Sequence, residues 1–185
     1  MQNARFFAFP LIVLSVFSLA VMGSKQSTSK PITKEEADAA IKAWMGAFVG
    51  LSDADSAEAF ITKFYAYGSV ETMFKPTTAA SSTQKADAVA YFTKQGPMMA
   101  LATGPPAYDV KTFINDPSGN GFAYGQWTLS LKAVPPPVKE KLDMAKLGLN
   151  ADGTSLTFDY TLGFTRVGGA IKIFLHHNVW TPTPQ

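Results

Sequence analysis

The sequence contains no cysteine among its 185 residues and only two histidines. The missing thiols exclude disulfide bonds, cysteine-ligated zinc and thiol nucleophiles, so stability must come from the burial of a core. No Asn-x-Ser/Thr sequon occurs, so N-glycosylation is not expected. Charged residues make up 16%, the net charge is +2 and no basic run appears, so we expect no nucleic-acid partner. With 46% hydrophobic residues, the chain is long enough for one globular domain.

The N-terminal residues differ in kind from the rest. Arg5 precedes an apolar stretch over residues 6–21, and small residues follow it. This order predicts a cleaved secretory signal peptide over residues 1–23 and then a polar linker over 24–32, which could instead begin a plastid-type transit segment. An uncleaved anchor is the alternative, but the stretch contains Pro10 and is shorter than the ~20 residues that span a bilayer. We therefore expect the mature protein in the secretory pathway, as a secreted, periplasmic or organelle-lumen protein.

A helix is predicted to begin at Thr33. Thr33 and Glu36 have the spacing of a capping box, and the apolar residues that follow recur at helical intervals. Gly50 stands where that helix should end. A second helix is expected from about Ser56 and a third over residues 84–94.

The remainder of the chain has the alternating pattern of β-strands. The pattern predicts helices packed against one side of a curved antiparallel sheet, an α+β cone whose mouth can hold a ligand. We expect a single domain over residues 33–182. The expected strands cover residues 69–74, 108–115, 122–131, 155–166 and 170–180, and a weak helical pattern interrupts them over 135–153.

The two histidines are neighbours in the last expected strand. Successive strand residues point to opposite faces, so only one imidazole can enter the interior. Taking Ile173, Leu175, His177 and Val179 as one face, we predict that His177 faces inward, where a pKa near 6.5 suits proton transfer. An ordinary core histidine is the alternative. His176 would face outward. A catalytic zinc ion needs three protein ligands, and only one histidine can enter the pocket. We therefore expect neither a metal nor another cofactor.

Three segments, in order, resemble the nuclear-transport-factor-2-like (SnoaL-like) superfamily. Within it they resemble the calcium/calmodulin-dependent kinase II association-domain branch, and most of all the iota-class carbonic anhydrases. Those enzymes carry Leu-Phe-Lys-Pro-Thr, then Ser-Tyr-Phe, and a terminal His-His-His-Ser-Ser-x-x-Pro. The matching segments are Met-Phe-Lys-Pro-Thr at 73–77, Ala-Tyr-Phe at 90–92, and residues 158–164 followed by His176, His177 and Pro182.

The resemblance implies a metal-free site in which hydroxyl groups and an imidazole hold a water beside CO2. Matched position by position, Thr77 takes the place of the family's threonine, Tyr91 that of its tyrosine and His177 that of its last histidine. The resemblance therefore implies a carbonic anhydrase, a lyase, whose catalytic residues are Thr77, Tyr91 and His177 and whose partner is a small-molecule substrate.

Three positions depart from the family. Leu175 replaces a histidine, and Asn178 and Val179 replace two serines. We expect Tyr160, Leu175 and Val179 to line the substrate pocket, so that Val179 removes a hydroxyl from it. The more apolar wall favours a second interpretation, a non-catalytic association or small-ligand-binding domain. A third, a SnoaL-like isomerase or cyclase with His177 as the base, has no evident partner carboxylate.

The outer face of the sheet is expected to be rich in aromatic side chains. Phe174 and Trp180 point away from the predicted inner face, and Trp127 is a further candidate on the neighbouring strands. Exposed aromatic patches usually mark protein interfaces. We therefore expect a homodimer that associates through the sheet.

Overall fold

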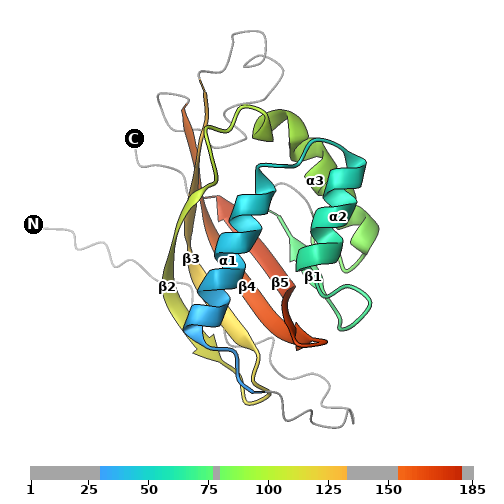
Figure 1. Ribbon diagram of the computed structural model, residues 1–185, viewed down its shortest axis with the longest axis vertical. Helices are drawn as coiled ribbons and strands as arrows, with labels where there is room; N and C mark the ends of the chain where they lie inside the picture. The colour runs from blue at the N-terminus through green and yellow to red at the C-terminus, as the bar shows by residue number, and fades with distance from the viewer. Residues whose placement is uncertain (1–29, 77–79, 133–153, 181–185) are drawn as a thin grey trace, which may run out of the picture.

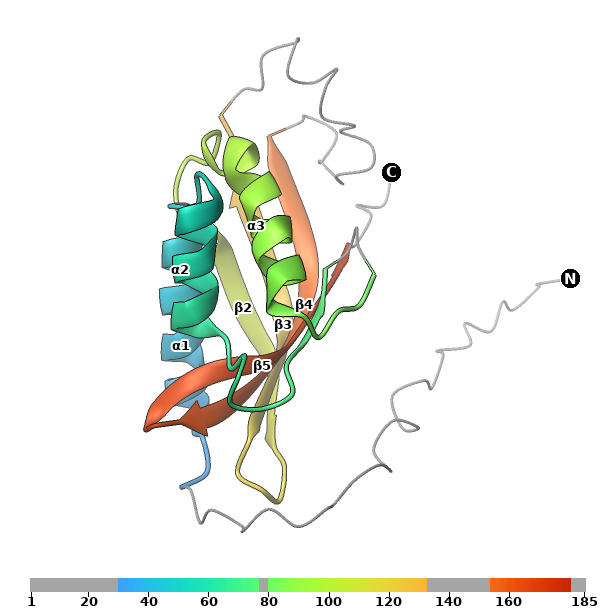
Figure 2. The same cartoon turned by 90° about the vertical axis from the view of Figure 1, so that its right-hand side faces the viewer.

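A computed structural model describes residues 30–76, 80–132 and 154–180. The helices lie against one face of a strongly curved, open sheet (Figures 1 and 2), which confirms the expected α+β architecture. In the described ranges, no helix is both long and apolar enough to cross a membrane. The elements are α1 (Lys34–Phe48), α2 (Ala54–Phe64), β1 (Met73–Lys75), α3 (Lys85–Met99), β2 (Ala107–Asn115), β3 (Gly121–Ser130), β4 (Ser155–Val167) and β5 (Ala170–Trp180).

Some predictions fall on residues that the structure does not describe. The signal peptide over 1–23, most of the linker over 24–32 and the helical pattern over 135–153 lie outside the described ranges. They stay predictions.

The sheet has the strand order β1-β5-β4-β3-β2. The pairs β2–β3, β3–β4 and β4–β5 are antiparallel, whereas β1 runs parallel to β5. The sheet is therefore mixed rather than wholly antiparallel as expected. The turn between β4 and β5 uses Gly168 and Gly169 with φ of 57° and 84°. Two consecutive residues with positive φ are what a tight hairpin turn matching the twist of the strands requires.

The predicted start of α1 is confirmed. The Thr33 hydroxyl accepts a hydrogen bond from the Glu36 amide at 3.2 Å, and the Glu36 carboxylate accepts one from the Thr33 amide at 2.9 Å. Arg166 at the end of β4 donates to the same carboxylate at 2.6 Å, which ties the helix to the sheet. A second capping box, between Asp53 and Ser56, starts α2 slightly earlier than expected.

Two elements differ in length from the prediction. Helix α3 continues past residue 94 to Met99, and Gly96 lets this last part approach the α1–α2 loop, because a Cβ there would lie 2.7 Å from the Ser52 carbonyl oxygen. The strand expected over 69–74 is reduced to β1, since its ladder with β5 covers only three residue pairs.

The core is an aromatic layer between the helices and the sheet. Trp44 stacks on Phe48 at 5.3 Å between ring centroids, and Trp127 stacks on Phe158 at 4.5 Å. Trp127 is only 4% exposed, so its expected place on the outer patch is wrong. Alternate residues of β3 are buried and Trp127 belongs to that inward set. Each such buried ring contributes about 1.5–3 kcal/mol through apolar burial.

Candidate active site

A β-bulge in β5 decides which histidine enters the interior. Gly163 pairs with Leu175 and Phe164 pairs with Ile173, so Phe174 has no partner across the ladder. One extra residue reverses the alternation of side chains beyond it. Ile173 and His176 therefore both face the helices, with exposed fractions of 2% and 1%. Asn178, two residues on, is 7% exposed on the same inner face.

The prediction that His177 faces the interior is therefore wrong. His177 is half-buried on the outer face, beside Thr161 of β4 and Lys75 of β1. Partial burial lowers the pKa of His177, and the nearby positive charge of Lys75 lowers it further. The prediction counted alternate residues from Ile173, and this alternation of inward and outward side chains is reversed after the bulge. The catalytic role of His177 stays a prediction, although its side chain points away from the inner face.

His176 sits in an aromatic enclosure. Its Nδ1 lies 2.5 Å from the hydroxyl of Tyr65, and its ring makes edge contacts with Trp44 and Phe74 at centroid distances of 5.3 and 5.2 Å. Burial lowers the pKa of His176 to about 4, an effect that a hydrogen-bond contact with the Asn178 side chain partly opposes. The ring is therefore neutral at physiological pH. Its Nε2 makes no hydrogen bond to any residue of the described ranges.

Tyr65 reaches this enclosure because of where α2 ends. It is the residue after the helix, it is extended, and it forms a parallel bridge with Ile173 of β5. Burial raises the pKa of Tyr65 well above 10, so the phenol keeps its proton. Sequence reasoning missed this residue. The available signal was the alternation of Tyr65 and Tyr67 directly after the apolar stripe of α2.

Tyr67 extends the group of hydroxyls near the enclosure. Its ring stacks on Tyr65 at 6.1 Å, and its hydroxyl is buried with no hydrogen-bond partner in the described part of the chain. Burial, followed by the nearby charge of Asp87, raises the pKa of Tyr67 to about 12.

Tyr91 lies on α3 between the protein surface and the enclosure. Its ring contacts Phe74 at 5.2 Å, and Phe74 in turn contacts His176. On its other side Tyr91 lines a pocket of about 420 Å³ that also includes Ser82 and Asp87. One aromatic ring thus connects this pocket to the buried imidazole. The predicted partner Thr77 lies outside the described residues.

The three expected pocket-lining residues do not share one wall. Tyr160 is inside, 1% exposed, and donates its hydroxyl proton to the Asp109 carbonyl at 2.6 Å. Leu175 and Val179 lie on the outer face, where Val179 is 48% exposed. The expected loss of a pocket hydroxyl at Val179 therefore does not affect the interior. The inward polar residue beyond His176 is Asn178, which stands opposite Tyr160.

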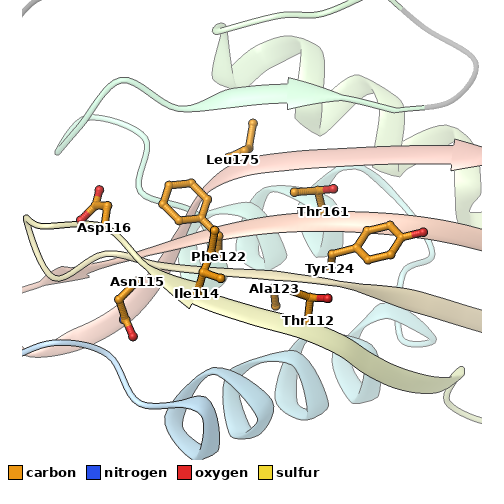
Figure 3. A pocket seen from close by; sticks show the side chains of 9 residues that line it. All are labelled: Thr112, Ile114, Asn115, Asp116, Phe122, Ala123, Tyr124, Thr161 and Leu175. Atoms are coloured by element: carbon orange, nitrogen blue, oxygen red, sulfur yellow. The ribbon is translucent and has the colours of Figure 1, made fainter. Parts of the chain in front are cut away.

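The outer face of the sheet carries an apolar groove of about 520 Å³. Figure 3 shows its lining side chains on neighbouring strands, with Phe122 and Tyr124 from β3 and Leu175 from β5. Ile114 of β2 also lines the groove and is 60% exposed. Phe174 meets Phe122 edge-on at 5.5 Å on this face. The Trp180 side chain, expected in the same patch, lies outside what the structure describes.

Metal ligands do not gather near any of these groups. Within residues 30–76, 80–132 and 154–180, no three histidine, aspartate or glutamate side chains come together as a metal site would require.

Solved structures with the same fold belong to the nuclear-transport-factor-2-like class. A protein of unknown function from Shewanella oneidensis is 12% identical, with a TM-score of 0.53, covering 78% of this chain and 97% of its own. Aln2 from a Streptomyces species is 15% identical, with a TM-score of 0.56 and coverages of 82% and 94%. A putative calcium/calmodulin-dependent protein kinase II association domain from Xanthomonas campestris is 16% identical, with a TM-score of 0.52 and coverages of 88% and 99%.

A match at the level of the sequence shows the family of this chain. The family described as metal-independent carbonic anhydrase matches residues 35–180, and this chain belongs to that family. No curated protein matches the chain. The family confirms the resemblance drawn from the three sequence segments.

Proposed function

We propose that this protein hydrates CO2 to bicarbonate without a metal ion, at the enclosure around His176. Family membership supports the reaction. The observation that carries the site is a neutral imidazole, 1% exposed, whose Nε2 makes no hydrogen bond to the described residues. In the reaction, the oxygen of a water molecule bonds to the carbon of CO2. The water loses one proton to solvent buffer, and bicarbonate leaves.

The surroundings of His176 suit both the substrate and the charge that develops on it. CO2 is small and apolar, and the rings of Trp44 and Phe74 provide an apolar environment. As the new bond forms, negative charge grows on the CO2 oxygens. Fixed hydrogen-bond donors in a low-dielectric site stabilise such charge, and each is worth about 10²–10³-fold in rate. His176 Nε2 and the Asn178 carboxamide are the inward-facing groups that could do this.

Tyr91 and Thr77 complete the proposed site. The resemblance implies that their hydroxyls orient the attacking water, and Tyr91 stands at the side of the enclosure nearest the surface pocket. Positioning of a water beside its target is itself a large source of rate enhancement, because it replaces a bimolecular encounter by an intramolecular step. His177 takes no part in this proposal, since it faces the other way.

Stopped-flow measurement of CO2 hydration tests the proposal. The protein should accelerate hydration equally with and without a strong chelator. Thr77→Ala and Tyr91→Phe should lower the rate at least tenfold. Matched controls make the same chemical changes elsewhere: Thr161→Ala alters the outer face, and Tyr108→Phe removes a hydroxyl that bonds Asp38 of α1. A rate that does not exceed the buffer rate, or that the chelator abolishes, contradicts the proposal.

Association through the sheet is a second proposed function, and the outer groove is the observation that favours it. An apolar groove of about 520 Å³ with Ile114 60% exposed beside it is unusual for an isolated surface. The Xanthomonas campestris structure is described as a putative association domain. We propose that two copies of this chain meet there as a homodimer, which is compatible with catalysis on the opposite face of the sheet. Light scattering that gives a monomer mass contradicts it.

A further inference from the structure

We propose that Tyr65 is a positioning residue that fixes His176 as the tautomer with its proton on Nε2, so that the imidazole acts as a hydrogen-bond donor and not as a base. This inference rests on the proposed CO2 hydration for its purpose. Its structural content, the tautomer and the residue that sets it, is independent of that activity.

The hydrogen bond between Tyr65 and His176 has one favoured direction. The oxygen–nitrogen distance is 2.5 Å, short for a bond between two neutral groups. A phenol whose pKa is raised well above 10 keeps its proton, and a neutral imidazole carries only one. The indole of Trp44 acts on the same phenol and lowers its pKa, as a donor facing the oxygen does.

His176 Nδ1 is the hydrogen-bond partner that the structure shows for the Tyr65 hydroxyl, and the neighbouring Trp44 offers no acceptor. An indole N–H can donate but never accept. Trp44 therefore cannot take the phenol proton, and its own Nε1 has no hydrogen-bond partner among the described residues. The proton of Tyr65 is left to point at His176 Nδ1. Because Nδ1 then accepts, the single proton of the neutral ring lies on Nε2.

The ring is held so that Nε2 keeps one direction. Trp44 and Phe74 meet it edge-on, with interplanar angles of 87° and 76°, and Tyr65 stacks beside it at 6.0 Å. Nε2 is a buried donor with no full hydrogen bond to the described residues, although the Asn178 side chain acts on the ring as a hydrogen-bond acceptor and raises its pKa. A buried donor without a partner costs about 1–3 kcal/mol. A site that binds an oxygen anion uses this unsatisfied donor, since the product or the transition state supplies the missing acceptor.

A base at this position would need the opposite arrangement. It would need a lone pair on Nε2, and the Tyr65 contact puts the lone pair on Nδ1 instead, where the phenol already occupies it. The proton lost by the attacking water therefore leaves by another route to solvent. Tyr65 and His176 together resemble an oxyanion-stabilising pair in their chemistry rather than a proton-transfer pair.

Nitrogen-15 NMR of the histidine rings is the direct test. Long-range proton–nitrogen spectra distinguish a protonated ring nitrogen from an accepting one. The chain has only two histidines, so the spectrum of His177→Gln assigns both. We expect His176 to show a protonated Nε2 and an accepting Nδ1 at neutral pH. Tyr65→Phe should yield a mixture of tautomers, whereas Tyr108→Phe, which loses a surface hydroxyl that donates to Asp38, should leave the spectrum unchanged. A proton on Nδ1 in the unmodified protein overturns the inference, even if Tyr65→Phe does not fold.

Kinetics separate this inference from the proposed function. Tyr65→Phe should lower kcat for CO2 hydration by about 10- to 100-fold with little change in KM, a loss like that found when the partner that orients a metal-bound histidine is removed. The pH profile should show no ionisation of His176 above pH 5. Unchanged kcat in folded Tyr65→Phe overturns the positioning role. If the unmodified protein has the Nε2–H tautomer but no hydration activity, the proposed function fails and the Tyr65 assignment stands.

Discussion

Acidification should destabilise this protein mainly through His176. The folded chain holds the imidazole neutral with a pKa of about 4, against 6.5 for an ordinary histidine. Between these two pH values the unfolded chain binds a proton that the folded chain does not. The contribution of this residue to the free energy of unfolding is therefore complete above pH 6.5 and falls as the pH falls from 6.5 to 4. Below pH 4 this residue causes no further loss.

The magnitude follows from the two pKa values. Each pH unit between about 4 and 6.5 is worth about 1.4 kcal/mol, so the full loss is about 3 kcal/mol. Carboxylates act in a lower window. The pKa values of Glu36 and Asp53 are lowered, first by the hydrogen bonds from Arg166 and from the Ser56 amide respectively, so their contributions are lost only as the pH falls below their ordinary values of 4.5 and 3.8.

Urea denaturation followed by tryptophan fluorescence measures the effect at a series of pH values from 7 to 4. The unmodified protein should lose about 3 kcal/mol over this range. His176→Gln should lose much less, whatever its absolute stability, because the variant has no buried imidazole that is kept unprotonated in the folded state. His177→Gln should keep most of the slope, since His177 is only half-buried. Parallel pH dependences in the unmodified protein and His176→Gln would show that His176 does not cause the loss of stability.

Three further changes test the fold and the outer face. Thr33→Ala removes the capping hydroxyl of α1 and should cost about 1 kcal/mol in urea denaturation. Gly125→Ala should cost several kcal/mol or prevent folding, because a Cβ would lie 2.0 Å from the Asp109 carbonyl oxygen. Its control, Gly46→Ala, meets nothing within 4 Å in α1 and should stabilise by up to about 1 kcal/mol. Leu175→Lys places a charge in the outer groove and should convert the proposed dimer to monomer in light scattering, while folding is retained.

The fold could be predicted because its signals are local. The capping box at Thr33 and the alternation in β4 are short-range patterns, and both appear in the structure as expected. The parallel pairing of β1 with β5 could not be predicted in the same way. It joins segments about a hundred residues apart, and a three-residue strand has too little pattern to indicate its partner.

The site was predicted only in part, because one extra residue in β5 changes which side chains face inward. A single imidazole enters the interior, as predicted, but the bulge at Phe174 turns His176 inward and leaves His177 on the outer face. The sequence of β5 contains no turn residues or glycine from which the bulge could be predicted. The bulge accompanies Gly163 on β4, which lacks the side chain that would collide with Leu175 and Phe174. Tyr65 was missed because its contact with His176 depends on how α2 ends against the sheet.

Stopped-flow CO2 hydration by His176→Gln and by His177→Gln is the decisive measurement for the proposed site. The two variants make the same chemical change on adjacent residues of one strand, and only the first removes the inward imidazole. We predict a loss of at least about 100-fold in kcat for His176→Gln and near-normal kcat for His177→Gln. Loss of activity in His177→Gln with retention in His176→Gln would contradict this prediction.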